Sequence, residues 1–124
     1  MVGGYAVGHH GYPRATADLD IWIATTEANA EKVADALREF GFNSPQLTPQ
    51  LFREHDKVVR MGLPPVRIEI LTTISGVSFE ACFARRTVAD LGGEPVNFIS
   101  LEDLKANKRA AARHQDLADL ENLP

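Results

Sequence analysis

The run DLDIWI at residues 18–23 constrains the fold most, because charged and apolar residues alternate within it. Alternation with a period of two predicts a β-strand, which we place at residues 18 to 24. Its aliphatic residues would face a core, while Asp18, Asp20 and Trp22 would share the opposite face. The Cα atoms of the two aspartates are then about 6.6 Å apart, twice the strand rise. Such close carboxylates repel each other, and a divalent cation is the usual means of offsetting that repulsion.

Glycines dominate the segment that precedes this strand. Their spacing does not match the GxGxxG loop of dinucleotide-binding proteins, and no complete strand precedes them. The pair Gly3-Gly4 instead favours the start of a short helix, whose first N–H groups are free to meet an anion. Tyr12-Pro13 ends that helix. Arg14 and Thr16 then lead into the strand.

The remaining pattern predicts an α+β fold in α/β layers, formed by one domain over residues 1–124. An amphipathic helix begins after a threonine cap at residues 25–26, continues to Phe40 and ends at Gly41. The other expected elements are a helical turn near 48–52, strands at 57–61 and 66–71, a short helix at 78–85 with Phe79, Cys82 and Phe83 inward, a hairpin of 86–91 and 95–99 about Gly92-Gly93, and helices at 100–113 and 114–123.

A third acidic residue lies on the predicted strand 66–71. Glu69 stands between Ile68 and Ile70, in an arrangement that resembles the surroundings of Asp20. It is therefore a candidate to join the aspartate pair on a neighbouring strand. A simple ion pair with Arg67 or Arg60 is an equally good interpretation of this glutamate.

The helix predicted at 100–113 carries a basic face. Ser100 caps it, with Asp103 three residues on as an acidic partner in the capping box. Phosphate binding and a solvated surface are equally good interpretations of that face. Asp116 and Asp119, which follow the helix, offer a third interpretation by pairing with it. The cations recur at every fourth residue, with one more beside them: Lys105, Arg109, Arg113 and Lys108.

Composition limits the partners and the compartment. The formal charge of −4 argues against general affinity for nucleic acid. Cys82 is the only cysteine, so an internal disulfide is excluded and a cytoplasmic location is expected. No apolar run approaches the roughly 20 residues that span a bilayer, and the first residues do not resemble a signal peptide.

Gly3-Gly4, Asp18-Leu19-Asp20 and Glu69 together resemble the motif set of the nucleotidyltransferase superfamily, which includes DNA polymerase β and the minimal nucleotidyltransferases. The segments GGYAVGHHGYPRATADLDIWI and LKANKRAAARHQDLADL are similar to the sequences of a bacterial, toxin–antitoxin-linked subgroup of this superfamily. The resemblance implies a mixed β-sheet flanked by helices. The family has a further helix and strand before the glycine pair, where this sequence has Met1-Val2, so we expect an N-terminally shortened member.

The resemblance also implies roles for individual residues. Asp18 and Asp20 would hold two Mg²⁺ or Mn²⁺ ions, and Glu69 would bind one of them and help to activate the attacking hydroxyl. Lys108 is the first choice to contact the β- or γ-phosphate. The full set of implied nucleotide-binding residues is Gly3, Gly4, Arg14, Thr16, Lys105, Lys108 and Arg113.

The implied function is transfer of NMP from an NTP to a protein or RNA hydroxyl, with a toxin or antitoxin protein as an expected partner. The alternative is a nucleotidyltransferase-fold module that binds a nucleotide or a partner protein without turnover. A third interpretation is an interaction domain whose carboxylates are ordinary surface groups. Assembly as a homodimer is left open by the sequence.

Overall fold

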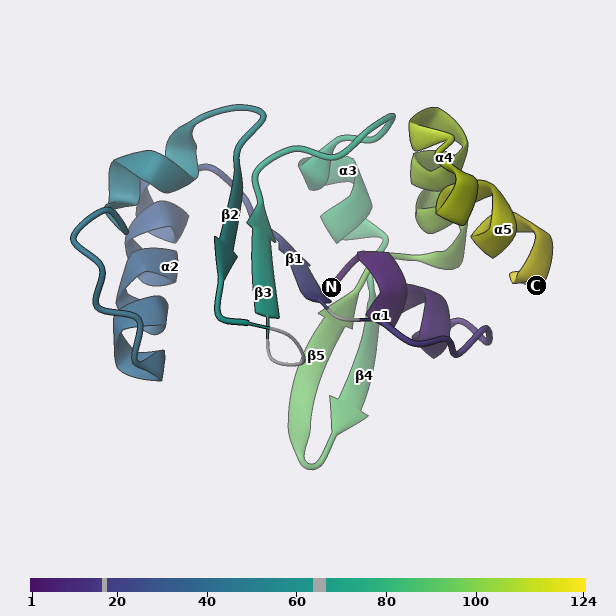
Figure 1. The fold of residues 1–124 in the computed structure, drawn as a ribbon, viewed down its shortest axis with the longest axis horizontal. Helices are drawn as coiled ribbons and strands as arrows, with labels where there is room; N and C mark the ends of the chain where they lie inside the picture. The colour runs from purple at the N-terminus through teal and green to yellow at the C-terminus, as the bar shows by residue number, and fades with distance from the viewer. Residues whose placement is uncertain (17, 64–66) are drawn as a thin grey trace.

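The protein has an α+β fold in which a mixed three-stranded sheet carries the acidic residues (Figure 1). The computed structural model describes residues 1–16, 18–63 and 67–124, so Val66 and the expected turn at Pro64-Pro65 lie outside the described residues. The central strand is β3 (Arg67–Leu71). It pairs in parallel with β1 (Asp18–Trp22) and antiparallel with β2 (Val58–Met61).

Helix α2 (Glu27–Phe40) and the 3₁₀ turn η1 (Pro49–Arg53) pack beside this sheet, at the left of Figure 1. The predicted caps of α2 are confirmed: the Thr26 side chain accepts a hydrogen bond from the backbone N–H of Asn29 at 3.3 Å, and Gly41 adopts a left-handed conformation. The apolar face of α2 closes the first core, whose buried residues are Ile23, Ala30, Ala34, Leu37, Leu47, Phe52, Met61 and Ile70.

A second core lies where α1 (Gly3–His9) meets the predicted hairpin, β4 (Thr87–Leu91) and β5 (Glu94–Phe98). The ring of His9 stacks on that of Phe98 with centroids 4.1 Å apart. The buried residues of this core are Val2, Ala6, Val7, Phe98, Ile99, Leu104 and Leu123.

Helix α3 (Phe79–Ala84) lies above the hairpin in Figure 1. Cys82 is buried, as predicted, but the inward placement of Phe83 is wrong, because this residue is 41% exposed. The guanidinium of Arg86 stacks over that ring at 4.1 Å instead. An aromatic residue beside a cation retains a favourable contact without burial.

The last two helices are α4 (Leu101–Ala111) and α5 (His114–Asn122). Ala112 adopts a left-handed conformation with φ of 52° and ends α4 two residues earlier than predicted. Arg113 therefore does not lie on the basic face of α4, which corrects the predicted four-residue repeat. Ser100 accepts the backbone N–H of Asp103 at 3.2 Å, but the carboxylate of Asp103 pairs with Arg85 rather than completing a capping box.

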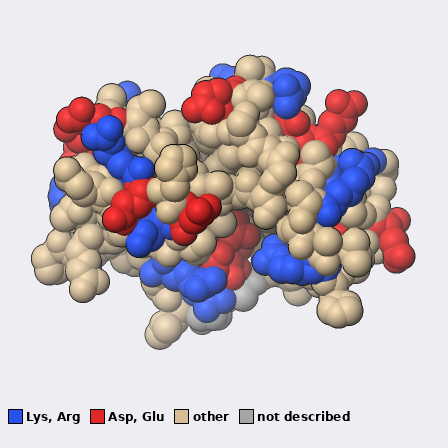
Figure 2. Space-filling model, turned by 90° about the horizontal axis from the view of Figure 1, so that it is seen from above, with Lys and Arg blue, Asp and Glu red and all other residues tan. Residues whose placement is uncertain are grey.

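Basic and acidic side chains are intermingled over the face shown in Figure 2. Such mixing agrees with the modest formal charge of −4. Within the described part of the chain, none of the helices has the length and apolar character required to cross a bilayer.

Candidate metal centre

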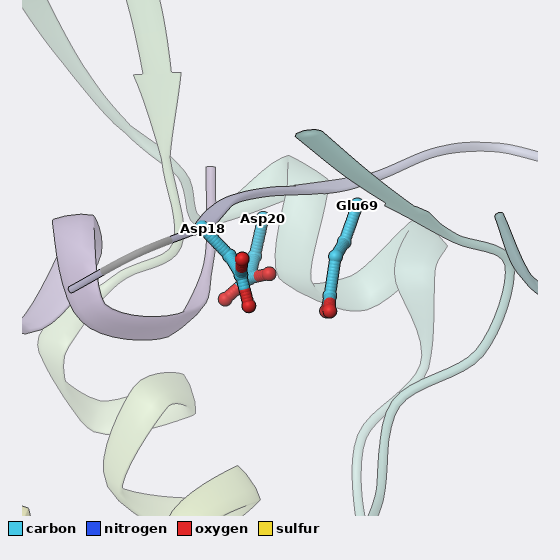
Figure 3. Close-up of side chains that lie close together, drawn as sticks. All are labelled: Asp18, Asp20 and Glu69. Carbon is cyan, nitrogen blue, oxygen red and sulfur yellow. The ribbon is translucent and has the colours of Figure 1, made fainter. Parts of the chain in front are cut away.

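Three carboxylates meet on one face of the mixed sheet. Asp18 and Asp20 stand two residues apart on β1, so their side chains project to the same side. Glu69 lies directly across from Asp20 in the parallel register of β1 and β3. One oxygen from each of the three carboxylates lies within 4.8 Å of the others, and Figure 3 shows the three side chains pointing the same way. The predicted partnership of Glu69 with the aspartate pair is thus confirmed as a juxtaposition.

Two of these carboxylates already have cationic neighbours. Arg67 donates two hydrogen bonds to Asp18, and Arg60 donates one to Glu69 at 2.6 Å. The hydrogen bonds from Arg67 hold the pKa of Asp18 below its ordinary value. The alternative interpretation of Glu69 as the partner of Arg60 is also confirmed. Sequence reasoning did not pair Arg67 with Asp18, although their matching positions in the β1–β3 register make that contact natural.

Asp20 lacks such compensation. Its Oδ1 is buried and has no hydrogen-bond partner among the described residues. Burial, followed by the adjacent carboxylates of Glu69 and Asp18, raises the pKa of Asp20 to about 7. A buried acceptor without a donor destabilises a fold by about 1–3 kcal/mol. A cation at this oxygen would remove that cost, so the donor set fits a hard divalent metal such as Mg²⁺ or Mn²⁺.

The glycine pair brings α1 against this cluster. Gly3 has φ of +66°, and a Cβ there would lie 2.0 Å from Oδ2 of Asp20. A Cβ on Gly4 would lie 2.7 Å from the Thr16 side chain. Both positions therefore require glycine because backbone approaches neighbouring residues closely. Contact of this backbone with a triphosphate stays a prediction.

The predicted phosphate-binding cations form an ion-pair network with the last helix. The Lys108 side chain is 5% exposed, and its ammonium lies 3.1 Å from Asp116 and 3.0 Å from Asp119. Arg14 donates two hydrogen bonds to Asp119, at 2.7 and 2.9 Å, and Arg113 donates to Asp116 at 2.7 Å. Pairing of Asp116 and Asp119 with the basic helix is confirmed. A phosphate contact by Lys108, Arg14 or Arg113 stays a prediction. It would require each cation to bind the phosphate and its aspartate partner on α5 at the same time.

The other predicted phosphate ligands have local partners too. Lys105 donates to the backbone carbonyl of Pro124 at 2.6 Å. The Thr16 hydroxyl donates to the backbone carbonyl of Asp18 at 3.3 Å, which ties the loop before β1 to the first aspartate. Arg109 is exposed on α4. The structure therefore brings Thr16 to the acidic cluster and leaves Lys105 and Arg109 at the surface of the helix pair.

A scan of the sequence against protein-family models and a search of curated proteins find no match.

Proposed function

We propose that the protein is a metal-dependent nucleotidyltransferase that moves NMP from an NTP to a protein or RNA hydroxyl. The observation that supports this proposal most is the convergence of Asp18, Asp20 and Glu69, in which one buried oxygen of Asp20 has no hydrogen-bond partner within the described part of the chain. Carboxylates on adjacent strands of a rigid sheet are suited to holding two divalent ions side by side. A Cβ at Gly3 would collide with Asp20, so the backbone at the start of α1 lies directly against the cluster.

The reaction assigns a task to each carboxylate. The oxygen of the acceptor hydroxyl bonds to the α-phosphorus, and the bond from that phosphorus to the β-phosphate oxygen breaks, releasing pyrophosphate. Bound metal ions would supply the positive charge that such a transfer requires. Asp18 and Asp20 would hold the ions. Glu69 would bind one of them once Arg60 releases its Oε1, and would accept the hydroxyl proton at Oε2.

A second candidate function has its own observation. Arg67 and Arg60 neutralise two of the three carboxylates without a metal. In a module that binds a nucleotide or a partner protein without turnover, these ion pairs would be permanent. In an enzyme they must yield to the metal, which is easiest for Arg60 because its side chain is 62% exposed.

The first experiment measures metal binding by thermal unfolding with and without Mn²⁺ or Mg²⁺. A ligand specific for the native state at 100 times its Kd stabilises it by about 2.7 kcal/mol. We expect saturating metal to raise the Tm of the wild type by the amount that corresponds to this stabilisation. The Tm of Asp20→Asn should not rise. Asp35→Asn is the matched control, because Asp35 is an exposed aspartate on α2. An unchanged Tm for the wild type at millimolar metal would refute the metal centre.

The second experiment measures transfer. The protein is incubated with Mg²⁺, each of the four α-³²P-labelled NTPs and a bacterial lysate, and labelled macromolecules are separated on gels. Label should appear with the wild type and the Asp35→Asn control, and fall at least a hundredfold with Asp20→Asn. Metal binding without any transfer would favour the binding module. Equal label with wild type and Asp20→Asn would exclude catalysis at this cluster.

A further inference from the structure

Two arginines share the face of the sheet that carries the acidic cluster. Strand β3 contributes Arg67 beside Glu69, and β2 contributes Arg60 directly across from that glutamate. Arg67 in turn lies across from Asp18 in the parallel register of β1 and β3. Residues paired across neighbouring strands point to the same side of a sheet. The two guanidinium groups therefore face the same space as the three carboxylates shown in Figure 3.

These two ion pairs differ from the buried network at α5 in their exposure. The side chains of Arg60 and Arg67 are 62% and 33% exposed, whereas Lys108 and its aspartate partners are buried. An ion pair between exposed side chains is worth about 0–1 kcal/mol, while breaking a buried pair costs about 3–5 kcal/mol. Arg60 and Arg67 can therefore change partner at little cost, and Lys108 is held in place.

Each arginine also keeps part of its guanidinium group unengaged. Arg67 donates to Asp18 through Nε and Nη2, and Arg60 donates to Glu69 through Nε. Among the described residues, Nη1 of Arg67 and both terminal nitrogens of Arg60 have no acceptor. A guanidinium group suits phosphate as well as carboxylate, because its parallel N–H groups match both. A phosphate can thus contact either arginine before the carboxylate releases it.

The charge of the incoming ligand decides whether such an exchange is favourable. A divalent cation alone competes with the arginines for the carboxylates and is repelled by them, because all of them are positive. A cation that arrives with a polyphosphate brings acceptors for the released guanidinium groups. Mg²⁺ is usually bound in this way, by one or two carboxylates together with the phosphates of a substrate. The two ion pairs therefore disfavour free metal and favour a metal–polyphosphate complex.

We propose that Arg60 and Arg67 are exchangeable counter-ions, which neutralise Glu69 and Asp18 in the empty site and move to the phosphates when a metal–triphosphate complex binds. This inference rests on the proposed function, since it concerns the same cluster, and it adds a coupling between the two ligands. Coupling of this kind is reciprocal, so metal and triphosphate each raise the affinity for the other by the same factor. The site is thereby selective for metal that is already bound to a substrate.

The test compares Mn²⁺ alone with a preformed complex of Mn²⁺ and tripolyphosphate, which is the phosphate chain common to all NTPs. EPR quantifies binding of Mn²⁺, and isothermal titration calorimetry quantifies binding of the complex. Arg60→Gln and Arg67→Gln should each bind Mn²⁺ alone about threefold more tightly than wild type, because a carboxylate is released. Each should bind the complex about tenfold more weakly, because the phosphates lose a charged partner. Arg60→Gln suffices if Arg67→Gln does not fold, since the Arg60 side chain is largely exposed.

This reversal, tighter for the metal and weaker for the complex, is the signature of exchange. Arg38→Gln is the matched control, because it removes an exposed arginine that pairs with Asp35 on α2. Both of its affinities should equal those of the wild type. Arg67→Lys keeps the charge without the paired N–H groups and should bind the complex more weakly than wild type. Equal affinity would show that the charge acts at a distance, which contradicts a change of partner.

NMR supplies a readout that does not depend on affinity. The Nε–H resonances of Arg60 and Arg67 report the partners of the two guanidinium groups, and Mg²⁺ replaces Mn²⁺ to avoid paramagnetic broadening. Saturating Mg²⁺–tripolyphosphate should shift both resonances and leave that of Arg38 in place. Two unmoved resonances in the saturated protein would mean that the ion pairs are permanent, and the exchange would be refuted.

The outcomes separate this inference from the proposed function. Mn²⁺ binding without the reversal would overturn the exchange alone and leave the transferase to its own assay. The reversal without transfer of label to any macromolecule would support the exchange and count against the transferase. Absence of Mn²⁺ binding by every form, with or without tripolyphosphate, would overturn both.

Discussion

Replacing Lys108 with methionine removes the cation at the centre of the buried ion-pair network while keeping a side chain of similar length. The side chains of Lys108, Asp116 and Asp119 are 5%, 2% and 0% exposed. Removing one partner of a buried ion pair costs about 3–5 kcal/mol, since the remaining charge is left uncompensated. Asp116 keeps Arg113 and Asp119 keeps Arg14, so we expect the lower end, about 3 kcal/mol. For a domain of this size that lowers Tm by roughly 10 °C.

The assay is urea unfolding followed by circular dichroism at pH 7, with Arg109→Met as the control. Arg109 is exposed on the same helix, so its replacement should change the free energy of unfolding by less than about 0.5 kcal/mol. A Lys108→Met variant within about 1 kcal/mol of the wild type would refute the argument. It would mean that the two arginines alone compensate the aspartates.

The stability difference between Lys108→Met and the wild type should also depend on pH. Burial by itself raises the pKa of Asp116 and Asp119, but hydrogen bonds outweigh it, from Arg113 and Lys108 on Asp116 and from Arg14 and Lys108 on Asp119. The pKa of each carboxyl is therefore lowered by folding. Its contribution to stability is present above the unfolded pKa of about 3.9 and is lost as pH falls through the lower, folded pKa. The deficit of Lys108→Met relative to wild type should therefore narrow as the pH falls below about 4.

Three more predictions concern the cluster and the thiol. Gly3→Ala should destabilise the fold by about 2 kcal/mol in urea unfolding, because φ is +66° and the new Cβ would collide with Asp20; a neutral result would contradict the close approach. Arg60→Ala should change stability by less than about 1 kcal/mol, since the ion pair is largely exposed on the arginine side, yet tighten Mn²⁺ binding severalfold by freeing Glu69; weaker binding would argue against this glutamate as a ligand. Burial raises the pKa of the Cys82 thiol to about 11, so it should react with Ellman's reagent at pH 8 only in urea; rapid reaction of the folded protein would disprove that burial.

Local rules predicted the elements that local chemistry determines. Thr26 and Gly41 cap α2, the two glycines turn the β4–β5 hairpin, and the alternation at residues 18–23 places two aspartates on one face. The partnership with Glu69 followed from the similar pattern of a second strand. In these cases the signal lies within a few residues of the feature it predicts.

The missed features concern the last helices and α3, and one of them depends on what packs against α4 from elsewhere in the chain. Helical periodicity placed Lys108 beside exposed cations, but α5 folds back over that side of α4 and buries its ammonium. The end of α4 at Ala112 was missed because alanine favours helix and rarely adopts positive φ. Phe83 was expected inside on apolar character alone, whereas Arg86 offers its ring an exposed partner. The burial of Lys108 is the error in which a tertiary contact overrides a local preference, since Phe83 and Arg86 are only three residues apart.

The bond between Arg14 and Asp119 joins residues that are 105 positions apart. Contacts of such long range form late, because the loop between them must close before they contribute. During synthesis, β1 and β3 emerge well before α5, so a nascent chain carries its three acidic residues while the segment at Arg14 still lacks its anchor. The segment that leads into the acidic cluster is therefore anchored only once the last helix has been made and has packed in place.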